Sequence, residues 1–307
     1  MKHAVGIDLG GTNIKAALVN GETGEVVQHR STATRDGEWV DGQPRFALGV
    51  RSLVEELEAV AGEGPLPVGL SAPGLADSSG RCIAWMPGRM HGLERLDWGD
   101  FLERRVAVLN DAHAALLGEV WTGAAKGLRH VCMLTLGTGV GGAVFADGKL
   151  LRGAIGRAGH LGHVTVNATG VKDDFNTPGS LERAIGNQSV GERGEGRYET
   201  THALVAAAQA GDPQAQDVWS RSIRDLAAAI ASMINVLDPE VVIVGGGIAS
   251  GAGEFLFEPL RRQVAEYEWQ PGGHSCPVVP AVAGEWAGAV GSVYAVLNPE
   301  VACDRGQ

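Results

Sequence analysis

An internal repeat constrains the fold of this chain more than any other feature. AVGIDLGGTNIKAALV (residues 4–19) and VCMLTLGTGVGGAVFA (residues 131–146) are each an apolar strand, a Gly/Thr turn and a second β-rich strand. Such a repeat predicts two similarly built lobes, and 307 residues are enough for two. A third glycine turn follows another apolar run, VVIVGGGIAS, at residues 241–250.

The turns suggest a phosphate ligand. Glycine after a strand lets the backbone approach a ligand closely, and Gly/Thr turns that present N–H groups bind anions. Two such turns suit a triphosphate. A dinucleotide fingerprint would instead need G-x-G-x-x-G at the start of a helix, and only VGGGIASGAG could open one. Any single turn could also be an ordinary tight turn, but three turns together favour one shared ligand.

Composition limits the partners. The formal net charge of -11 argues against nucleic acid or an anionic membrane as the main partner. The first residues, MKHAVGIDLGG, contain too few apolar positions for a signal peptide or membrane span, so we expect a cytoplasmic protein. Four cysteines lie far apart with no C-x-x-C pair, so we expect reduced thiols and no cysteine-bound zinc; they are Cys82, Cys132, Cys276 and Cys303.

Periodicity and breaker residues predict the main helices. The expected helices are residues 46–61, 200–211, 214–237 and 285–297. A short strand is predicted at residues 105–109. It breaks at Asn110-Asp111 into a helix that either residue could cap.

The segments GIDLGGTNIKAALV, LNDAHAALLGE, LTLGTGVGGAV, GHLGHVTV, GSLE and VIVGGGIA occur in this order along the chain. In order and spacing they resemble the ROK sugar kinases, members of the actin/hexokinase ATPase superfamily. The resemblance implies an α/β fold of two RNase H-like lobes, with ATP in the cleft and the sugar between the lobes. It also implies a homodimer. The expected lobes are residues 1–115, joined by a C-terminal helix at 289–307, and residues 116–288.

By the same resemblance, Asp111 is the general base and Asp8 holds Mg²⁺ through water. The positions matching the family's ATP contacts are Asp8, Gly10, Gly11, Thr12, Gly137, Thr138, Gly139, Gly245, Gly246 and Gly247. The positions matching its sugar contacts are Gly74, Arg89, Asn110, Asp111, His160, His163 and Glu182.

Two of these sugar positions depart from the family pattern. Arg89 stands where the family has an asparagine, and His160 where it has the glutamate of E-x-G-H. Both changes move the pocket toward positive charge, which favours an anionic sugar derivative. Alternatively, Arg89 turns to solvent and His160 donates to a neutral sugar.

The family's zinc loop is also changed. Its three cysteine positions correspond to Asp173, Phe175 and Ser180, so no structural zinc is expected. A rebuilt metal site that combines His160, His163, Asp173 and Asp174 stays open as an alternative.

Two other functions account for part of these features. One is a nucleotide- or sugar-binding ROK homologue that has lost kinase activity, suggested by the altered pocket. The other is a sugar-responsive repressor, which would need a helix-turn-helix before the first glycine turn. That turn begins near residue 6, so a repressor is not expected.

Overall fold

The computed structural model describes residues 2–302. The chain forms two compact units: unit 1 is Met1–Leu128, Asp147–Gly159 and Val282–Gln307, and unit 2 is Arg129–Ala146 and His160–Ala281. The predicted lobe boundary at residues 115–116 falls inside helix α3 (Asp111–Thr122), all of which belongs to unit 1. This boundary differs because α3 packs against helix α10 (Ala287–Leu297) of the same unit.

The first sheet has the strand order β3-β2-β1-β6-β9. Its strands are β1 (His3–Leu9), β2 (Asn13–Asn20), β3 (Val26–Ala33), β6 (Val68–Ala72) and β9 (Val106–Asn110). Strands β1, β2 and β3 pair antiparallel, whereas β1, β6 and β9 pair parallel. Because parallel strands end at one edge, Asp8, Ser71 and Asn110 come close together there.

The second sheet has the equivalent order, β12-β11-β10-β13-β14. Its strands are β10 (Val131–Leu136), β11 (Val140–Ala146), β12 (Lys149–Leu150), β13 (Val241–Gly245) and β14 (Val278–Pro280). Strands β10 and β11 pair antiparallel, and β10, β13 and β14 pair parallel. The internal repeat therefore gives two sheets of one topology, and the predicted α/β fold class is confirmed.

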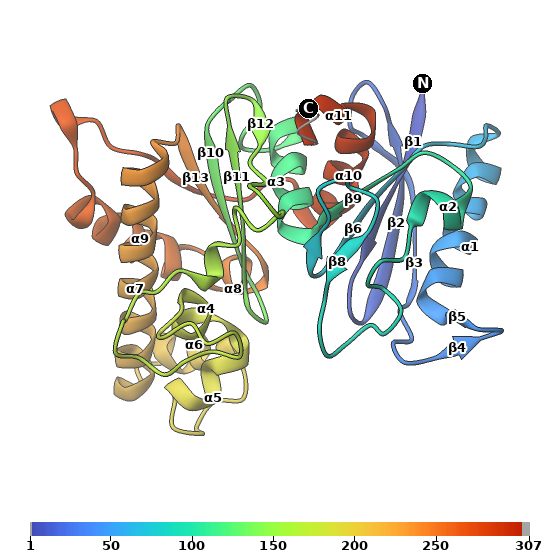
Figure 1. Ribbon diagram of the computed structural model, residues 1–307. Coiled ribbons are helices and arrows are strands. Elements are labelled where there is room, and N and C mark those ends of the chain that lie inside the picture. Colours follow the sequence, from blue (N-terminus) through green and yellow to red (C-terminus); the bar gives the residue numbers. More distant parts are fainter. Residues whose placement is uncertain (1, 303–307) are drawn as a thin grey trace. The chain divides into compact units, whose positions relative to one another are not determined.

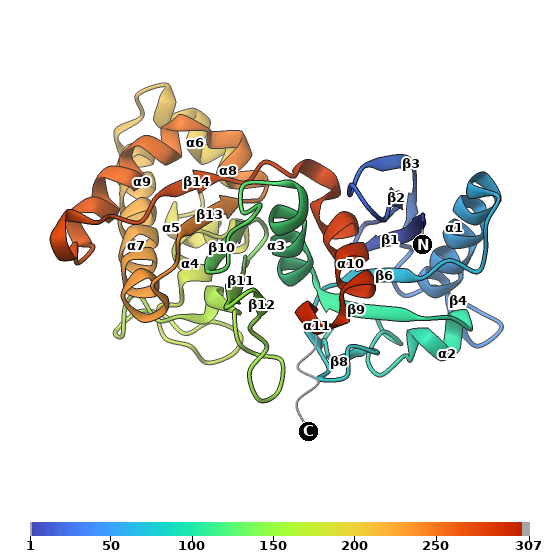
Figure 2. The same cartoon turned by 90° about the horizontal axis from the view of Figure 1, so that it is seen from above.

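Unit 1 places helices on both faces of its sheet. On one face, Val5, Ile7 and Leu9 pack with α1 (Arg45–Ala61). On the other, α10 lies so close that a Cβ on Gly6 would stand 2.1 Å from the carbonyl oxygen of Ala289. Helices α10 and α3 lie side by side in both views (Figure 1, Figure 2). A Cβ on Gly291 would meet the Ala114 carbonyl oxygen at 1.8 Å, so the small residues of α10 allow it to pack closely on α3.

The remaining elements of unit 1 are short. They are β4 (Trp39–Val40), β5 (Gln43–Pro44), β7 (Leu75–Ala76), β8 (Ile83–Trp85), α2 (Trp98–Leu102), η4 (Gly284–Trp286) and α11 (Pro299–Ala302).

Unit 2 has its own apolar core, to which the buried faces of α7 (Pro213–Leu237) and α9 (Glu254–Tyr267) contribute. These two helices pack against each other (Figure 1). Its other helical segments are η1 (Leu161–His163), α4 (Leu181–Ile185), η2 (Asn187–Ser189), α5 (Val190–Arg193), α6 (Thr201–Gln209), α8 (Gly247–Ala252) and η3 (Pro271–Gly273). Cys132 lies in this core, where burial raises the pKa of its thiol to about 12. The thiol therefore stays protonated and packs as a small apolar side chain.

The cysteines Cys82, Cys132 and Cys276 are unpaired, and Cys303 lies outside the described residues. Over residues 2–302, no helix combines the length and apolar character needed to cross a bilayer.

Candidate active site

The first glycine turn connects β1 to β2 and is open to solvent at Gly11 and Thr12. Protein donors occupy its carbonyl oxygens: the Thr34 hydroxyl donates to Gly10 at 2.6 Å and the Thr34 N–H donates to Thr12 at 2.9 Å. By contrast, within residues 2–302 the N–H groups of Gly11 and Thr12 have no backbone acceptor outside regular helices and strands. The turn therefore presents donors, as an anion site requires.

The second turn, between β10 and β11, repeats this arrangement in unit 2. The Asn187 and Gln188 N–H groups donate to the carbonyl oxygens of Gly137 and Thr138 at 2.9 and 2.8 Å. In the described chain no backbone acceptor of this kind is found for the N–H groups of Thr138 and Gly139. In both turns the carbonyl oxygens accept from protein donors, and N–H groups are left for another acceptor. An ordinary tight turn does not require this arrangement.

The third turn adjoins the second in unit 2. Gly246 has a φ of 89°, and a Cβ there would lie 2.4 Å from the carbonyl oxygen of Leu136, the residue before Gly137. Only glycine fits both the conformation and the contact. Helix α8 begins at Gly247, so this turn, unlike the other two, opens a helix.

Asp8 is the last residue but one of β1 and lies beside the first turn. Its Oδ1 accepts a hydrogen bond from the Ser71 hydroxyl at 2.8 Å, and Lys15 is the residue opposite Asp8 on the neighbouring strand β2. Burial raises the pKa of the Asp8 carboxyl, against the opposing effects of Ser71 and Lys15. A carboxylate beside a phosphate turn fits Mg²⁺, which usually takes one or two protein carboxylates together with water and substrate phosphates.

Asn110, the last residue of β9, caps α3. Its side-chain oxygen accepts from the Ala112 N–H at 3.0 Å and the His113 N–H at 3.4 Å, and its amide donates to the Gly74 carbonyl at 3.0 Å. The sequence left open which of two residues is the cap, and the structure identifies Asn110. Asp111 is thus not needed for capping, although its Oδ1 accepts from the Ala112 N–H at 2.8 Å.

Asp111 is solvent-accessible and electrostatically linked to Asp8. Desolvation raises the pKa of its carboxyl, and the negative charge of Asp8 raises it further. The Ala112 N–H, the Asn110 side chain and the Arg89 guanidinium act in the opposite direction. A carboxyl whose pKa is raised in this way is a suitable proton acceptor near neutral pH.

Two more predicted sugar residues lie near Asn110 in unit 1. Gly74 has a φ of 101°, and a Cβ there would stand 2.7 Å from the Trp85 carbonyl oxygen, so glycine is required. Arg89 lies in the loop after β8, and its Nη1 is 4.0 Å from the position of a Cβ on Gly11. Unit 1 therefore groups the first turn, Asp111, Asn110 and Arg89 at one end of its sheet.

The remaining predicted sugar residues belong to unit 2. Glu182 Oε2 accepts from the Val140 N–H at 3.1 Å, so its carboxylate lies against the second turn. His163 lies in η1, which approaches β11 so closely that a Cβ on Gly162 would meet the Val140 carbonyl oxygen at 2.0 Å. His160 precedes η1 and is partly buried.

The loop that corresponds to the family's zinc loop is held by hydrogen bonds and ring packing. Asp173 is buried; its Oδ1 accepts from the Phe175 and Thr177 N–H groups at 2.9 Å each, and its Oδ2 lies 3.7 Å from His163 Nδ1. The Phe175 ring packs edge-on against His163 with centroids 5.0 Å apart. Burial opposes ionisation of Asp173, but hydrogen bonds from the Thr177 and Phe175 N–H groups, together with the nearby Ser180 hydroxyl and His163, leave the pKa of its carboxyl below the usual value.

These residues do not suit zinc. Phe175 has no ligating atom, Ser180 is a poor substitute for a thiolate, and Asp173 Oδ1 already accepts two backbone N–H groups. Among residues 2–302 no group of three or more His, Cys, Asp or Glu side chains could hold a metal ion, and the alternative site that adds His160 and Asp174 forms no such group. Hydrogen bonds and ring packing hold the described loop around Asp173.

Replacing Asp173 by Ala should therefore loosen this loop. The change leaves two N–H groups without their acceptor, so we expect a loss of about 2–4 kcal/mol in the free energy of unfolding. Hydrogen exchange should accelerate at Phe175 and Thr177, and added zinc should restore neither property. The neighbouring exposed Asp174 provides the control Asp174→Ala, which should leave exchange unchanged. Recovery of protection in Asp173→Ala by stoichiometric zinc would contradict the metal-free account.

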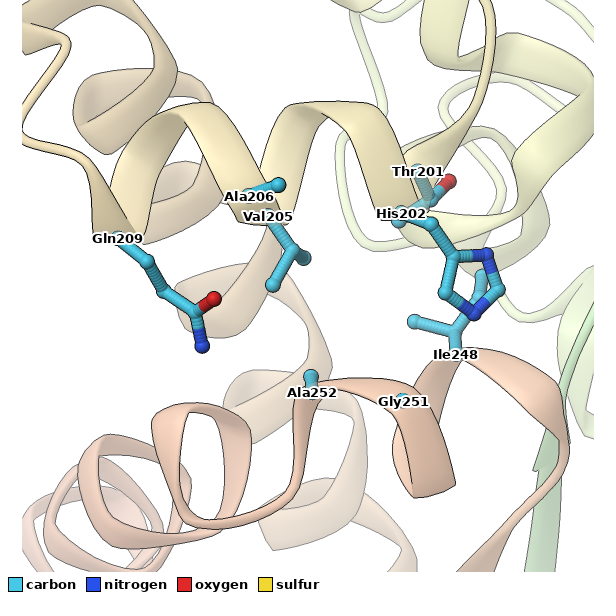
Figure 3. Close-up of a pocket in the computed structure, with 8 residues that line it drawn as sticks. All are labelled: Thr201, His202, Val205, Ala206, Gln209, Ile248, Gly251 and Ala252. Atoms are coloured by element: carbon cyan, nitrogen blue, oxygen red, sulfur yellow. The ribbon is translucent and has the colours of Figure 1, made fainter.

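A pocket lies beside the third turn, between α6 and α8 of unit 2 (Figure 3). His202 and Ile248 lie at one end and Gln209 at the other (Figure 3). The His202 Nε2 is 3.2 Å from the Gly247 carbonyl oxygen, which connects the pocket directly to the glycine turn. Its lining residues are Thr201, His202, Val205, Ala206, Gln209, Ile248, Gly251 and Ala252.

Three residues important to these sites were missed in the sequence. Ser71 supports Asp8, His202 lines the pocket, and Glu119 is a fully buried carboxylate in α3. Only Glu119 carried a visible signal, a single charge within the apolar run ALLGEVW. Ser71 and His202 are ordinary polar residues whose neighbours come from distant segments.

Two five-stranded sheets of one topology, each with a glycine turn between its first two strands, define a protein of the actin/hexokinase ATPase fold class. The ROK family model matches residues 4–298, so the chain belongs to the ROK family, as its motifs predicted.

Known proteins of this family resemble the chain over most of its length. Glucokinase of Thermotoga maritima is 34% identical over 284 residues, covering 86% of this chain and 87% of that protein. The solved ROK hexokinase of Thermus thermophilus is 31% identical with a TM-score of 0.83, covering 95% and 96% of the two chains. A ROK glucokinase of Streptomyces griseus, solved with glucose and AMPPNP, is 26% identical with a TM-score of 0.77, covering 95% and 98%. The prediction of a carbohydrate kinase agrees with these relatives.

Proposed function

We propose that the protein transfers the γ-phosphoryl group of ATP to a hydroxyl of a sugar or sugar derivative. The main support is the pair of equivalent turns, one in each sheet, whose carbonyls are occupied by protein and whose N–H groups are available. Phosphoryl transfer depends mostly on positioning and charge neutralisation, and such turns supply both. The solved relative with glucose and AMPPNP is consistent with this substrate pair.

In the proposed reaction Asp111 is the general base. It accepts the proton of the attacking sugar hydroxyl while that oxygen forms a bond to the γ-phosphorus. The bond from the γ-phosphorus to the bridging oxygen breaks, and its electron pair leaves with ADP. The capping role of Asn110 leaves Asp111 at the first turn of α3, where the solvent-accessible carboxylate can take this proton.

Asp8 would hold Mg²⁺ through water on the same side of unit 1. When bound, the metal neutralises phosphate charge. The Ser71 hydroxyl fixes the orientation of the Asp8 carboxylate, leaving its second oxygen for hydrated metal. In unit 2 we assign Glu182 and His163 to sugar hydroxyls, with Val140 and Asp173 orienting them.

ADP release tests this function directly. The protein, MgATP and a panel of neutral, N-acetylated and acidic sugars should give sugar-dependent ADP together with a sugar phosphate detected by mass spectrometry. Omission of Mg²⁺ should stop the reaction. ADP release that no sugar stimulates would contradict the kinase assignment and favour the homologue without kinase activity.

We further assign the pocket between α6 and α8 to the adenine base. Replacing Ala206 by Phe would fill it, and losing the base contacts should raise the KM for ATP about 10-fold or more, with little change in the KM for sugar. Ala203→Phe on the exposed side of α6 is the matched control, because Ala203 does not line the pocket. Equal KM values for ATP in the two variants would place the base elsewhere.

The predictions of a cytoplasmic location and a homodimer rest on the sequence and the family resemblance. Size-exclusion chromatography with light scattering tests the second.

A further inference from the structure

The loop that carries Arg89 has a fixed backbone. Gly88 and Met90, on either side of Arg89, have φ values of 85° and 53°. The Met90 side chain is buried in the core of unit 1, and its N–H donates to Asp36 Oδ2 at 3.1 Å. Met90 is thus anchored in a left-handed conformation, and this fixes the backbone at the exposed Arg89. Backbone conformations of this kind are often found at functional sites.

The Arg89 side chain is directed at the first glycine turn. Its Nη1 lies 4.0 Å from the position of a Cβ on Gly11, and no other heavy atom lies within 4 Å of that position apart from the residues adjoining Gly11 in the chain. Over residues 2–302 the guanidinium makes no hydrogen bond or ion pair with the protein, although its charge acts on Asp111. Its five N–H donors are therefore free for a ligand at this turn.

We propose that Arg89 is a catalytic residue that binds the phosphoryl group during its transfer, rather than a contact to the sugar. This inference rests on the proposed kinase function. Arg89 stays protonated and donates hydrogen bonds to the non-bridging oxygens of the γ-phosphoryl group. The hydroxyl proton goes to Asp111, and the electron pair of the breaking bond goes to ADP, so the arginine is unchanged at the end.

Charge supports this location. Asp8 and Asp111 already place two carboxylates near the first turn, and ATP adds further negative charge. Lys15, the cation opposite Asp8, has its ammonium 3.2 Å from Glu285 and is partly neutralised. Among the described residues, Arg89 is thus a cation beside this turn that forms no ion pair with the protein. A planar guanidinium suits phosphoryl oxygens especially well.

The variant Arg89→Asn separates the two roles, because asparagine is the residue that the family pattern has for the sugar. If Arg89 acts on the phosphoryl group, kcat should fall about 10²–10³-fold while the KM for sugar changes little. Inhibition by MgADP with aluminium fluoride, which mimics the transferring phosphoryl group, should weaken by a similar factor. Free guanidinium should restore part of kcat. Arg105→Asn, an exposed arginine of unit 1 before β9, is the matched control and should behave as wild type.

Three results would overturn this role. They are an unchanged kcat with a raised sugar KM, a switch of preference from acidic to neutral sugars, and inhibition by the aluminium fluoride complex equal to that of wild type. Wild-type turnover in the same experiment distinguishes failure of this inference from failure of the kinase function. If the wild type phosphorylates a sugar and Arg89→Asn does so equally well, only the Arg89 role is wrong.

Discussion

Asp111→Asn should reduce kcat by about 10²–10⁴-fold, the contribution of a positioned general base. The amide keeps the shape of the carboxylate and can still accept from the Ala112 N–H, but it cannot take the hydroxyl proton. The KM values for ATP and sugar should change much less. ADP release measures kcat, and Asp41→Asn in the exposed β4–β5 turn is the matched control. A variant with more than a tenth of wild-type kcat would show that Asp111 is not the base.

Stability distinguishes this loss from misfolding. The pKa of Asp111 is raised in the folded protein, so its carboxylate destabilises the fold at a pH above that raised value, and the penalty disappears at lower pH. Asp111→Asn should therefore melt at the same temperature as wild type or slightly higher at neutral pH. At pH 3, where the wild-type carboxyl is protonated, the difference should vanish.

The raised pKa also fixes the sign of the pH–rate profile. Asp111 must be deprotonated to act, so wild-type kcat/KM should fall on the acid side with a midpoint above the ordinary aspartate value of 3.8. Arg89 opposes this rise, so in Arg89→Asn the same limb should move to higher pH.

Glu119→Ala should lower the free energy of unfolding by about 3–5 kcal/mol, because it leaves three N–H groups without the buried carboxylate that accepts from them. Oε1 of the fully buried Glu119 accepts from Val282 and Ala283 at 2.8 Å each, and Oε2 accepts from Ala124 at 2.7 Å. These bonds connect α3 to the segment before α10. Urea unfolding followed by circular dichroism measures the loss.

Two further variants test the reason for this loss. Glu119→Gln keeps one acceptor oxygen but turns an amide toward an N–H group, so its stability should lie between those of Glu119→Ala and wild type. Glu55→Ala on the exposed side of α1 should stay within about 0.5 kcal/mol of wild type. Equal stability of Glu119→Ala and Glu55→Ala would mean that the three N–H groups find other partners.

The sequence predicted the repeated architecture because each half carries its own strand–turn–strand signal. Helices with strong periodicity were placed within a few residues; the helix predicted at 214–237 is α7, Pro213–Leu237. The domain boundary differed because no local signal shows that α3 packs on α10.

Motifs indicate which residues belong to the site, and the roles of these residues are proposals. The structure adds what motifs omit: Asn110 takes the cap, Ser71 supports Asp8, and Arg89 faces Gly11. These facts depend on contacts between segments far apart in the chain, which spacing along one sequence does not contain. The rearranged loop around Asp173 is of the same kind, because its partners meet only after folding.

That loop has a consequence for the protein in the cell. A domain whose loop is closed by a metal gains stability in proportion to the logarithm of the free metal concentration. A loop closed by the Asp173 carboxylate, the His163 ring and Phe175 has no such dependence, and it offers no thiolates to oxidants. The shape of this loop should therefore be insensitive to zinc scarcity and to peroxide.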